Sequence, residues 1–254
     1  HCSTLWISDV HLGSSHCKAD ELLQLLKRVD SRLIYLVGDI VDIWAMRRRV
    51  YWPESHNQVL RQLLKLSKSG VEIVYIPGNH DANYREICRS EFGHVKIREN
   101  AIHTTADGRR FLVTHGDELD YAVRYSRISR VIGDFAYEAL MILNRWLNKL
   151  RALSGKPYWS LARWAKSRVG QAEKAIQAYQ EAAVKLARHR GVDGIICGHL
   201  HFPVIHQYGE TWYCNDGDWV ENCTAMVEDA RGQLQLVQAI SAGSRERGVL
   251  LAAV

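Results

Sequence analysis

This sequence lacks a long apolar run. Its best candidate, residues 135–143, is interrupted by Glu138, and no run approaches the ~18 residues that a membrane-spanning helix requires. The N-terminal residues also lack the basic and apolar regions of a signal peptide. Hydrophobic residues make up 47% of the chain and charged residues 24%, which is ordinary for a soluble globular protein. We therefore expect a soluble, cytoplasmic protein.

Closely spaced cysteines are also missing. The chain has six cysteines but no CxxC pair and no regular spacing. This pattern argues against a disulfide framework or a zinc knuckle, and we interpret the cysteines as reduced thiols in a cytosolic core. There is no internal repeat or low-complexity segment, so a chain of 254 residues is expected to form one large α/β domain.

Positive charge is concentrated in one segment. Residues 118–190 contain fourteen Lys or Arg and six Asp or Glu, which gives this segment a net charge of +8. The whole chain has a net charge of +5, so the remaining residues together have a net charge of −3. A basic excess confined to one segment indicates an acidic or anionic partner at that place.

Five short runs rich in apolar and β-branched residues predict strands that are buried on both faces. Amphipathic stretches at 19–29 and 56–70 lie between the first three runs and predict helices, the second ending at Gly70. This alternation predicts βαβ units and a parallel or mixed sheet. After Gly198 the pattern changes to two hairpins, with turns at Tyr208-Gly209 and Arg231-Gly232. The five runs are residues 4–8, 32–37, 71–76, 109–114 and 193–197.

The segment 118–190 favours helix almost throughout. One apolar stripe is followed by a turn at Lys156-Pro157 and by a second predicted helix that extends to about residue 190. Such a stripe either packs against the rest of the protein or contacts a partner. Its residues are Ile132, Phe135, Ala139, Leu143, Leu147 and Leu150.

Polar side chains follow every one of the five predicted core strands. A single Asp-x-His or Gly-Asp after a strand is often only a turn, since Asp and Gly dominate turns. Five such clusters are different, because the carboxyl ends of strands in an open α/β sheet form its ligand-binding edge. The clusters are Asp9 and His11; Asp39 and Asp42; Asn79, His80 and Asp81; His115 and Asp117; and His199 and His201.

The residue types in these clusters indicate metal chemistry. Imidazole, carboxylate and amide ligands without thiolate suit Mn²⁺, Fe²⁺ or Zn²⁺. The set is too large for one ion but fits two ions that share a bridging carboxylate. Two cations roughly 3.5–4 Å apart can clamp a phosphate, activate a water nucleophile and offset charge in the transition state.

The motifs DxH, GDxxD, GNHD, HGD and GHxH occur in that order between residues 4 and 219, and this set resembles the calcineurin-like metallophosphoesterase superfamily. The resemblance implies a four-layer αββα sandwich of two mixed β-sheets flanked by helices, with a helical lid insertion. It implies a core at 1–117 and 191–240 and a lid at 118–190, with a C-terminal tail at 241–254. It also implies two divalent cations, for which Mn²⁺ is our first choice and Fe²⁺ or Zn²⁺ the alternatives.

The same resemblance assigns the ligands. Asp9, His11 and His201 would bind one ion, Asn79, His115 and His199 the other, and Asp39 would bridge them.

Three further residues are expected to support this centre. His80 cannot easily reach the ion that Asn79 binds, so it should face the substrate, where it could stabilise phosphoryl oxygens or protonate the leaving group. Asp81 would either orient His80 or cap the next helix. On the family pattern, Asp42 would support a neighbouring histidine from behind the metal ligands.

The long helical insertion is similar to the lid of the UDP-2,3-diacylglucosamine pyrophosphohydrolases of lipid A biosynthesis. That likeness implies hydrolysis of the diphosphate of a nucleotide-linked lipid to a lipid monophosphate and UMP, at the inner face of a membrane. Those enzymes carry Arg where this chain has His80, so the chain is more similar to a sister group with GNHD than to the best-known members. The residues expected to contact substrate are Arg47, Arg48, Arg49, Trp146, Trp159 and Trp164.

Two other functions stay open. A phosphodiesterase for cyclic nucleotides or nucleic acid would also use a basic lid, but the interleaved basic and stacking aromatic residues of single-strand binders are missing. A degenerate member could bind phosphates or an anionic membrane without turnover. Degenerate members lose ligands, whereas every expected ligand type is present here. Of the three, the lipid-directed hydrolase is our prediction.

Overall fold

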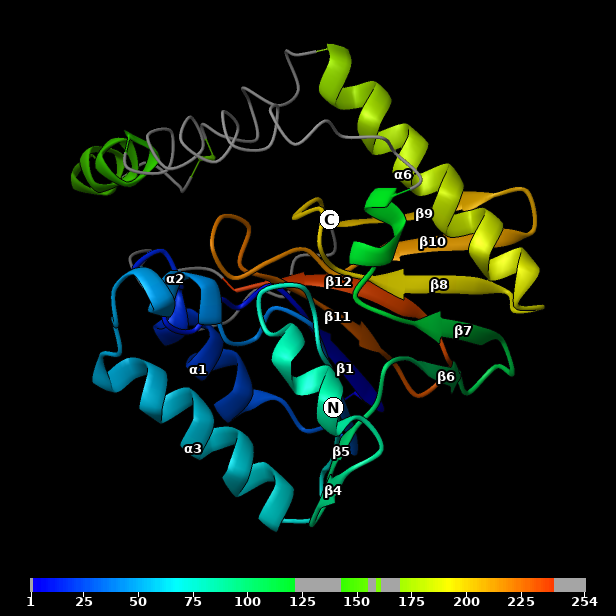
Figure 1. The fold of residues 1–254 in the computed structure, drawn as a ribbon, viewed down its shortest axis with the longest axis horizontal. Coiled ribbons are helices and arrows are strands. Elements are labelled where there is room, and N and C mark those ends of the chain that lie inside the picture. Colours follow the sequence, from blue (N-terminus) through cyan, green and yellow to red (C-terminus); the bar gives the residue numbers. More distant parts are fainter. Residues whose placement is uncertain (1, 122–142, 155–158, 161–169, 240–254) are drawn as a thin grey trace. The chain divides into compact units, whose positions relative to one another are not determined.

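The structure is a computed structural model that describes residues 2–121, 143–154, 159–160 and 170–239 (Figure 1). The chain divides into two compact units, which we describe separately. The expected tail at 241–254 lies outside the described residues. The first unit comprises residues 1–117, 183–240 and 249–254, and the second comprises residues 118–182 and 241–248.

A seven-stranded mixed sheet organises the first unit, in the order β12-β11-β1-β2-β3-β5-β4. Strands β1, β2, β3 and β5 run parallel, whereas β11, β12 and β4 are antiparallel to the strands they pair with. Its strands are β1 (Thr4–Ile7), β2 (Leu33–Val37), β3 (Glu72–Ile76), β4 (Glu91–Phe92), β5 (Val95–Ile97), β11 (Thr224–Glu228) and β12 (Leu234–Gln238).

A second sheet has five strands in the order β6-β7-β8-β10-β9. Its central strands β7, β8 and β10 are parallel, and β6 and β9 are antiparallel edge strands. All five predicted core strands and both predicted hairpins are present. The strands are β6 (Ala101–Thr104), β7 (Arg110–Val113), β8 (Gly194–Cys197), β9 (Val204–Tyr208) and β10 (Thr211–Asn215).

Both helices predicted between the first strands are confirmed as α1 (Ala19–Arg28) and α3 (Glu54–Lys68). They pack against each other and supply apolar side chains to one face of the first sheet (Figure 1). The short helix α2 (Ile43–Arg48) and the 3-10 helices η1 (Ala82–Ile87) and η2 (Asp117–Tyr121) follow strands β2, β3 and β7.

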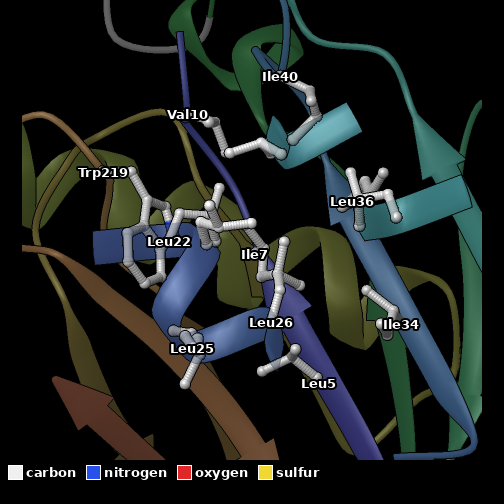
Figure 2. Close-up of a cluster of buried hydrophobic side chains, with 14 of the residues drawn as sticks. Leu5, Ile7, Val10, Leu22, Leu25, Leu26, Ile34, Leu36, Ile40 and Trp219 are labelled. Atoms are coloured by element: carbon white, nitrogen blue, oxygen red, sulfur yellow. The ribbon is translucent and has the colours of Figure 1, made fainter. Parts of the chain in front are cut away.

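Strand β1 shows why the core strands are continuous apolar runs in the sequence. Successive side chains of a strand point to opposite faces of the sheet. Leu5 and Ile7 face α1 and join the cluster drawn in Figure 2, together with Leu22 and Leu26. Trp6 points the other way, into a second cluster that contains residues from both sheets. Both faces of the first sheet are therefore buried at β1.

The described part of the second unit is mainly helical. Residues 143–153 form one helix, and α6 (Gly170–His189) begins in this unit and ends in the first, which confirms the helix predicted to extend to about residue 190. Within the first unit, the end of α6 contacts the second sheet: Arg188 Nε donates to Thr211 Oγ1 at 3.1 Å and its Nη2 to the Tyr208 carbonyl at 2.9 Å.

Two mixed sheets flanked by helices confirm the predicted α/β fold class. Among the described helices, none has the length and apolar character needed to cross a membrane. The parallel strands β1, β2 and β3, and likewise β7 and β8, end on the same edge of their sheets, which positions the loops described next.

Candidate metal centre

The loops after β1 and β8 bring three of the expected ligands together. His201 Nε2 lies 3.1 Å from Asp9 Oδ1, and His11 Nε2 lies 3.9 Å from the same oxygen. The donor atoms of these three residues all lie within 4.8 Å of one another. The other oxygen of Asp9 accepts a hydrogen bond from the backbone N–H of His199 at 2.8 Å. This cluster matches the set expected for one cation.

A second cluster forms around Asp39, after β2. Its Oδ2 lies 3.5 Å from His115 Nε2, and His115 Nε2 lies 3.3 Å from Asn79 Oδ1. The rings of His115 and His199 have their centroids 5.2 Å apart. Asp9 also groups with Asp39 and His115 within 4.8 Å, so it lies between the two clusters and not in the first alone.

Asp39 is the most central of the expected ligands. Its Oδ2 lies 3.5 Å from His115 Nε2, 3.9 Å from His80 Nε2 and 4.0 Å from His11 Nε2. One buried carboxylate therefore faces imidazoles from three separate loops. A carboxylate has two oxygens to share between ions, so this position suits a bridging ligand.

Hydrogen bonds behind the ligands fix the Nδ1 atoms of two imidazoles, so that each Nε2 faces the clusters. His115 Nδ1 donates to the Val37 carbonyl at 2.9 Å, and His11 Nδ1 donates to Asp42 Oδ2 at 3.1 Å. In the unprotonated form of each ring the Nε2 then carries the lone pair, since a neutral imidazole has one donor and one acceptor nitrogen. His11 Nε2 is buried and has no hydrogen-bond partner. The donor set and this free acceptor fit a divalent cation.

The backbone at these ligands is strained. Asp9, His11, Asp39, His199 and His201 have φ angles of 48°, 53°, 52°, 67° and 51°. Left-handed backbone is uncommon for residues other than glycine, and such conformations persist only where the surroundings hold them. Five of the seven expected ligands share this geometry. The surrounding structure therefore holds these residues in an unfavourable backbone conformation that directs their side chains into the clusters.

Two glycines leave room for the ligands. A Cβ at Gly78 would overlap Asp39 Oδ1 and lie 2.7 Å from His115 Nε2, and a Cβ at Gly198 would overlap Asp9 Oδ2 and the Ser8 side chain. These contacts are closer than real Cβ atoms approach, so any larger residue would displace a ligand. The glycines of GNHD and GHxH are therefore part of the site.

Buried carboxylates and imidazoles shift each other's ionisation. Burial alone would raise the pKa of Asp9, but neighbouring His201 lowers this pKa to about 2. Burial would lower the pKa of His11, but its hydrogen bond to Asp42 and nearby carboxylates raise it to about 9. The pKa of His115 is raised as well, against the effect of burial, by nearby carboxylates. A cation entering the cluster would compete with protons, since imidazole binds metal through an unprotonated nitrogen.

His80 lies beside the clusters and is held by Asp42. Its Nδ1 lies 2.9 Å from Asp42 Oδ1, and its side chain is 26% exposed. The Trp44 ring lies against it with centroids 4.4 Å apart. Asp42 therefore supports two histidines, His80 and His11, as predicted for one of them, and its Oδ1 also accepts from Ala45 N–H at the start of α2. Sequence reasoning missed Trp44.

Asp81 has neither of the roles expected for it. Its side chain forms no hydrogen bond or ion pair with His80, whose Nδ1 lies against Asp42 instead, and it makes no capping hydrogen bond to η1. Its buried carboxylate instead accepts from Gly78 N–H at 2.6 Å, Ile40 N–H at 2.8 Å and the Tyr75 hydroxyl at 2.5 Å. Adjacent residues in an irregular loop can point in different directions, and here Asp81 turns inward. It joins the loop after β3 to the loop after β2, which carries Asp39.

For the residues expected to contact substrate, the structure gives their location and exposure. Arg47, Arg48 and Arg49 are exposed at the end of α2. In the second unit, Trp146 and Trp159 are exposed. Trp164 lies outside the described residues.

Sequence reasoning also missed the segment 215–222, which consists of the last residue of β10 and the loop after it, on the same sheet edge as the end of β8. Its Asn-Asp-Gly-Asp stretch after a strand shows the pattern that identified the other five clusters. The sequence pattern predicts this strand only as one arm of a hairpin.

Several known proteins are similar to this chain. A sequence model of the family described as Calcineurin-like phosphoesterase matches residues 3–203. A protein from Porphyromonas gingivalis named UDP-2,3-diacylglucosamine hydrolase is 29% identical over 254 residues, covering 87% of this chain and 92% of the relative. A protein of the same name from Stenotrophomonas maltophilia is 29% identical, covering 91% and 96%. The solved structure of Yfce, a phosphoesterase from E. coli, matches with a TM-score of 0.48 and 15% identity over 99% of this chain and 97% of that one.

Proposed function

This chain belongs to the calcineurin-like phosphoesterase family and is a metal-dependent phosphohydrolase, and we propose that it hydrolyses the diphosphate of UDP-2,3-diacylglucosamine or a related nucleotide-linked lipid. In this reaction water adds to one phosphorus, the bridging P–O bond breaks, and the products are UMP and a lipid monophosphate. The shared name of the relatives from P. gingivalis and S. maltophilia supports this substrate.

One geometric observation carries the hydrolase chemistry: Asp39 Oδ2 faces the Nε2 atoms of three imidazoles at 3.5–4.0 Å. We propose that Asp39 bridges two divalent cations. When bound, such cations lower the pKa of water and offset charge on phosphoryl oxygens. Oxygen and imidazole donors without thiolate favour Mn²⁺, with Fe²⁺ or Zn²⁺ as alternatives. The remaining proposed ligands are Asp9, His11 and His201 on one side and Asn79, His115 and His199 on the other.

His80 is the proposed substrate-facing residue. It reaches the edge of the clusters, is partly exposed, and has its Nδ1 fixed by Asp42. Its Nε2 can therefore donate to a phosphoryl oxygen or protonate the leaving oxygen as the P–O bond breaks. The best-known pyrophosphohydrolases have Arg at this position. The guanidinium of Arg is planar, permanently charged and can donate two parallel hydrogen bonds, whereas the His80 imidazole offers one donor, Nε2. We expect a corresponding difference in how the diphosphate is held.

We propose that residues 118–190 act as a lid and that the helix 143–153 contacts an anionic membrane surface or the acyl chains of the substrate. Leu143, Trp146, Leu150 and Leu153 lie at helical spacing, and each is more than half exposed. The basic residues Arg145, Lys149 and Arg151 accompany this stripe, and the helix has no acidic residue. An exposed apolar stripe with basic neighbours is typical of helices that lie in a membrane interface.

The proposed location is the cytoplasmic face of a membrane. All six cysteines are free thiols, as is usual in a reducing compartment. A lipid-linked substrate would be presented at such a surface. Trp159, Trp164 and the arginines at 47–49 remain proposed contacts to the lipid or its phosphates.

A substrate panel with added Mn²⁺ tests this function. We expect turnover of UDP-2,3-diacylglucosamine to UMP and lipid monophosphate, with much slower hydrolysis of cyclic nucleotides and bis-p-nitrophenyl phosphate. Asp39→Ala is the matched control and should be inactive on all of them. Efficient hydrolysis of nucleic acid or cyclic nucleotides without turnover of the lipid would refute the proposed substrate. Bound metal without turnover of any compound would instead indicate a non-catalytic member.

A further inference from the structure

The segment 215–222, which begins at the last residue of β10 and which we call the clamp loop, contacts the backbone of the turn that carries two proposed ligands. Asn215 Nδ2 donates to the Gly198 carbonyl at 2.5 Å, and Asn222 Nδ2 donates to the His201 carbonyl at 3.0 Å. These two carbonyls stand at the first and last residues of the turn 198–201. Two asparagine amides from one loop therefore hold both ends of the turn that presents His199 and His201.

The turn needs such support because its backbone is strained. His199 and His201 have φ angles of 67° and 51°, and left-handed residues other than glycine stay in place only when neighbouring groups hold them. Within the turn, Leu200 N–H donates to the Gly198 carbonyl at 2.8 Å. Asn215 donates to that same carbonyl. The carbonyl at the far end of the turn, that of His201, accepts from Asn222.

Both amides are themselves fixed. Asn215 is fully buried, and its Oδ1 accepts from Gly217 N–H at 3.0 Å, which leaves the amide nitrogen to face Gly198. Asn222 Nδ2 donates to Asp218 Oδ2 as well as to His201. Asp218 Oδ1 in turn accepts from Val220 N–H at 2.8 Å. The orientation of each amide follows from these partners.

The clamp loop reaches the first proposed ligand too. Trp219 N–H donates to the Asp9 carbonyl at 3.0 Å. Asp216 Oδ1 accepts from the Ser8 hydroxyl at 2.6 Å, at the residue before Asp9. Asn215, Asp216, Trp219 and Asn222 are each at most 6% exposed. The loop thus contacts two of the chain segments that supply the cluster of Asp9, His11 and His201.

We propose that Asn215 and Asn222 are positioning residues that set the geometry of this cluster, and that Asn222 in particular holds His201 in reach of a divalent cation. The inference rests on the proposed metal centre but not on the identity of the substrate. Removing the Asn222 amide leaves a carbonyl in the turn unsatisfied and lets His201 leave its strained conformation. Partners that orient metal ligands typically change metal affinity about 10- to 100-fold when mutated.

Gln238 supplies a matched control. Its Nε2 donates to the Asn222 carbonyl at 2.9 Å, so Gln238→Ala removes one hydrogen bond to the clamp loop without touching the ligand turn. If the clamp loop had only a structural role, Gln238→Ala and Asn222→Ala would change metal binding to a similar extent. A positioning role predicts that only the asparagine variant alters metal binding.

The experiment is a calorimetric titration of metal-stripped protein with Mn²⁺, together with thermal unfolding of the stripped proteins. We expect two Mn²⁺ sites in the wild type and in Gln238→Ala. In Asn222→Ala one site should weaken about 10- to 100-fold while the other changes little. Asn222→Asp, which keeps the side-chain size but replaces the donor with an acceptor, should weaken the same site. It also provides the test if the alanine variant does not fold.

Two results would overturn the proposal. One is wild-type Mn²⁺ binding at both sites in Asn222→Ala and Asn222→Asp. The other is equal weakening in Gln238→Ala. Because metal binding is the readout, failure of the lipid substrate assay leaves this test intact. A wild type that binds no Mn²⁺ would reject the metal centre itself.

Discussion

Asp42 Oδ1 lies 2.9 Å from His80 Nδ1, although the two residues are far apart in the chain. The other oxygen of Asp42 lies 3.1 Å from His11 Nδ1. One carboxylate thus orients both a proposed metal ligand and the proposed substrate-facing imidazole. It couples cation binding to the placement of the group that would act on the phosphate.

Asp42→Asn should therefore weaken metal binding and slow turnover. An amide has only one acceptor oxygen, so one of the two imidazoles would face an N–H donor and adopt the other tautomer. We expect Mn²⁺ affinity to fall about 10- to 100-fold, as measured by calorimetric titration. Asn is as good a helix N-cap as Asp, so folding stability should change little. Wild-type affinity and turnover in this variant would contradict the shared role of Asp42.

His80→Ala should separate chemistry from metal binding. The side chain lies at the edge of the clusters and is partly exposed, so both cations should remain. The chemical step should slow by ~10²-fold or more, since a positioned proton donor is lost. Single-turnover kinetics and metal analysis on the same sample check this. His206→Ala, at an exposed histidine on β9, should leave both quantities unchanged. Loss of metal from His80→Ala would show that His80 is a ligand.

Gly78→Ala should abolish tight metal binding through steric overlap. The added methyl group would collide with the Asp39 carboxylate and with His115. Gly70→Ala is the control: its φ of +98° makes alanine strained, but no atom lies within 4 Å of the new Cβ. We expect the control to lower the unfolding midpoint and to keep both Mn²⁺ sites. If Gly78→Ala binds two ions normally, the packing of this site is not as described.

His103 should make stability depend on pH. Burial lowers its pKa, although hydrogen-bonded Glu228, 2.9 Å away, acts in the opposite direction. Around the unfolded-state pKa of about 6.5 the unfolded chain binds more protons at this site than the folded chain, so stability falls as pH drops through this range. Urea unfolding of wild type and His103→Gln at about pH 8 and about pH 5.5 measures the difference. The wild type should lose more stability than the variant on acidification; equal losses would assign the pH dependence to other groups.

Much of the centre could be predicted because its chemistry follows strand ends. The ligand loops after β1, β2, β3, β7 and β8 each join a buried apolar run to a polar cluster, and parallel strands deliver such clusters to one edge. That regularity places Asp9 with His201 and Asp39 with His115 although the partners in each pair are distant in sequence. The strand-end pattern identified the five clusters, and the family resemblance was needed to select the seven proposed ligands among their residues.

Side-chain direction within loops could not be predicted in the same way. Asp81 follows His80 directly, yet His80 turns to Asp42 while Asp81 turns to backbone N–H groups near Asp39. Sequence adjacency carries no information about such divergence. The helix 143–153 shows a related limit, since the spacing of its apolar residues indicates a stripe but not whether the stripe is covered. In the structure Leu150 and Leu153 are largely exposed.

The most direct test of the account is to count the divalent cations bound by the metal-reconstituted protein. We expect two Mn²⁺ per chain in the wild type by elemental analysis after desalting. Asp39→Ala should lose both ions and all phosphohydrolase activity while keeping its circular dichroism spectrum, because each cation loses a shared ligand. A wild type that holds one ion or none, or an Asp39→Ala variant that retains two ions and turnover, would contradict the central claim that Asp39 bridges a pair of cations.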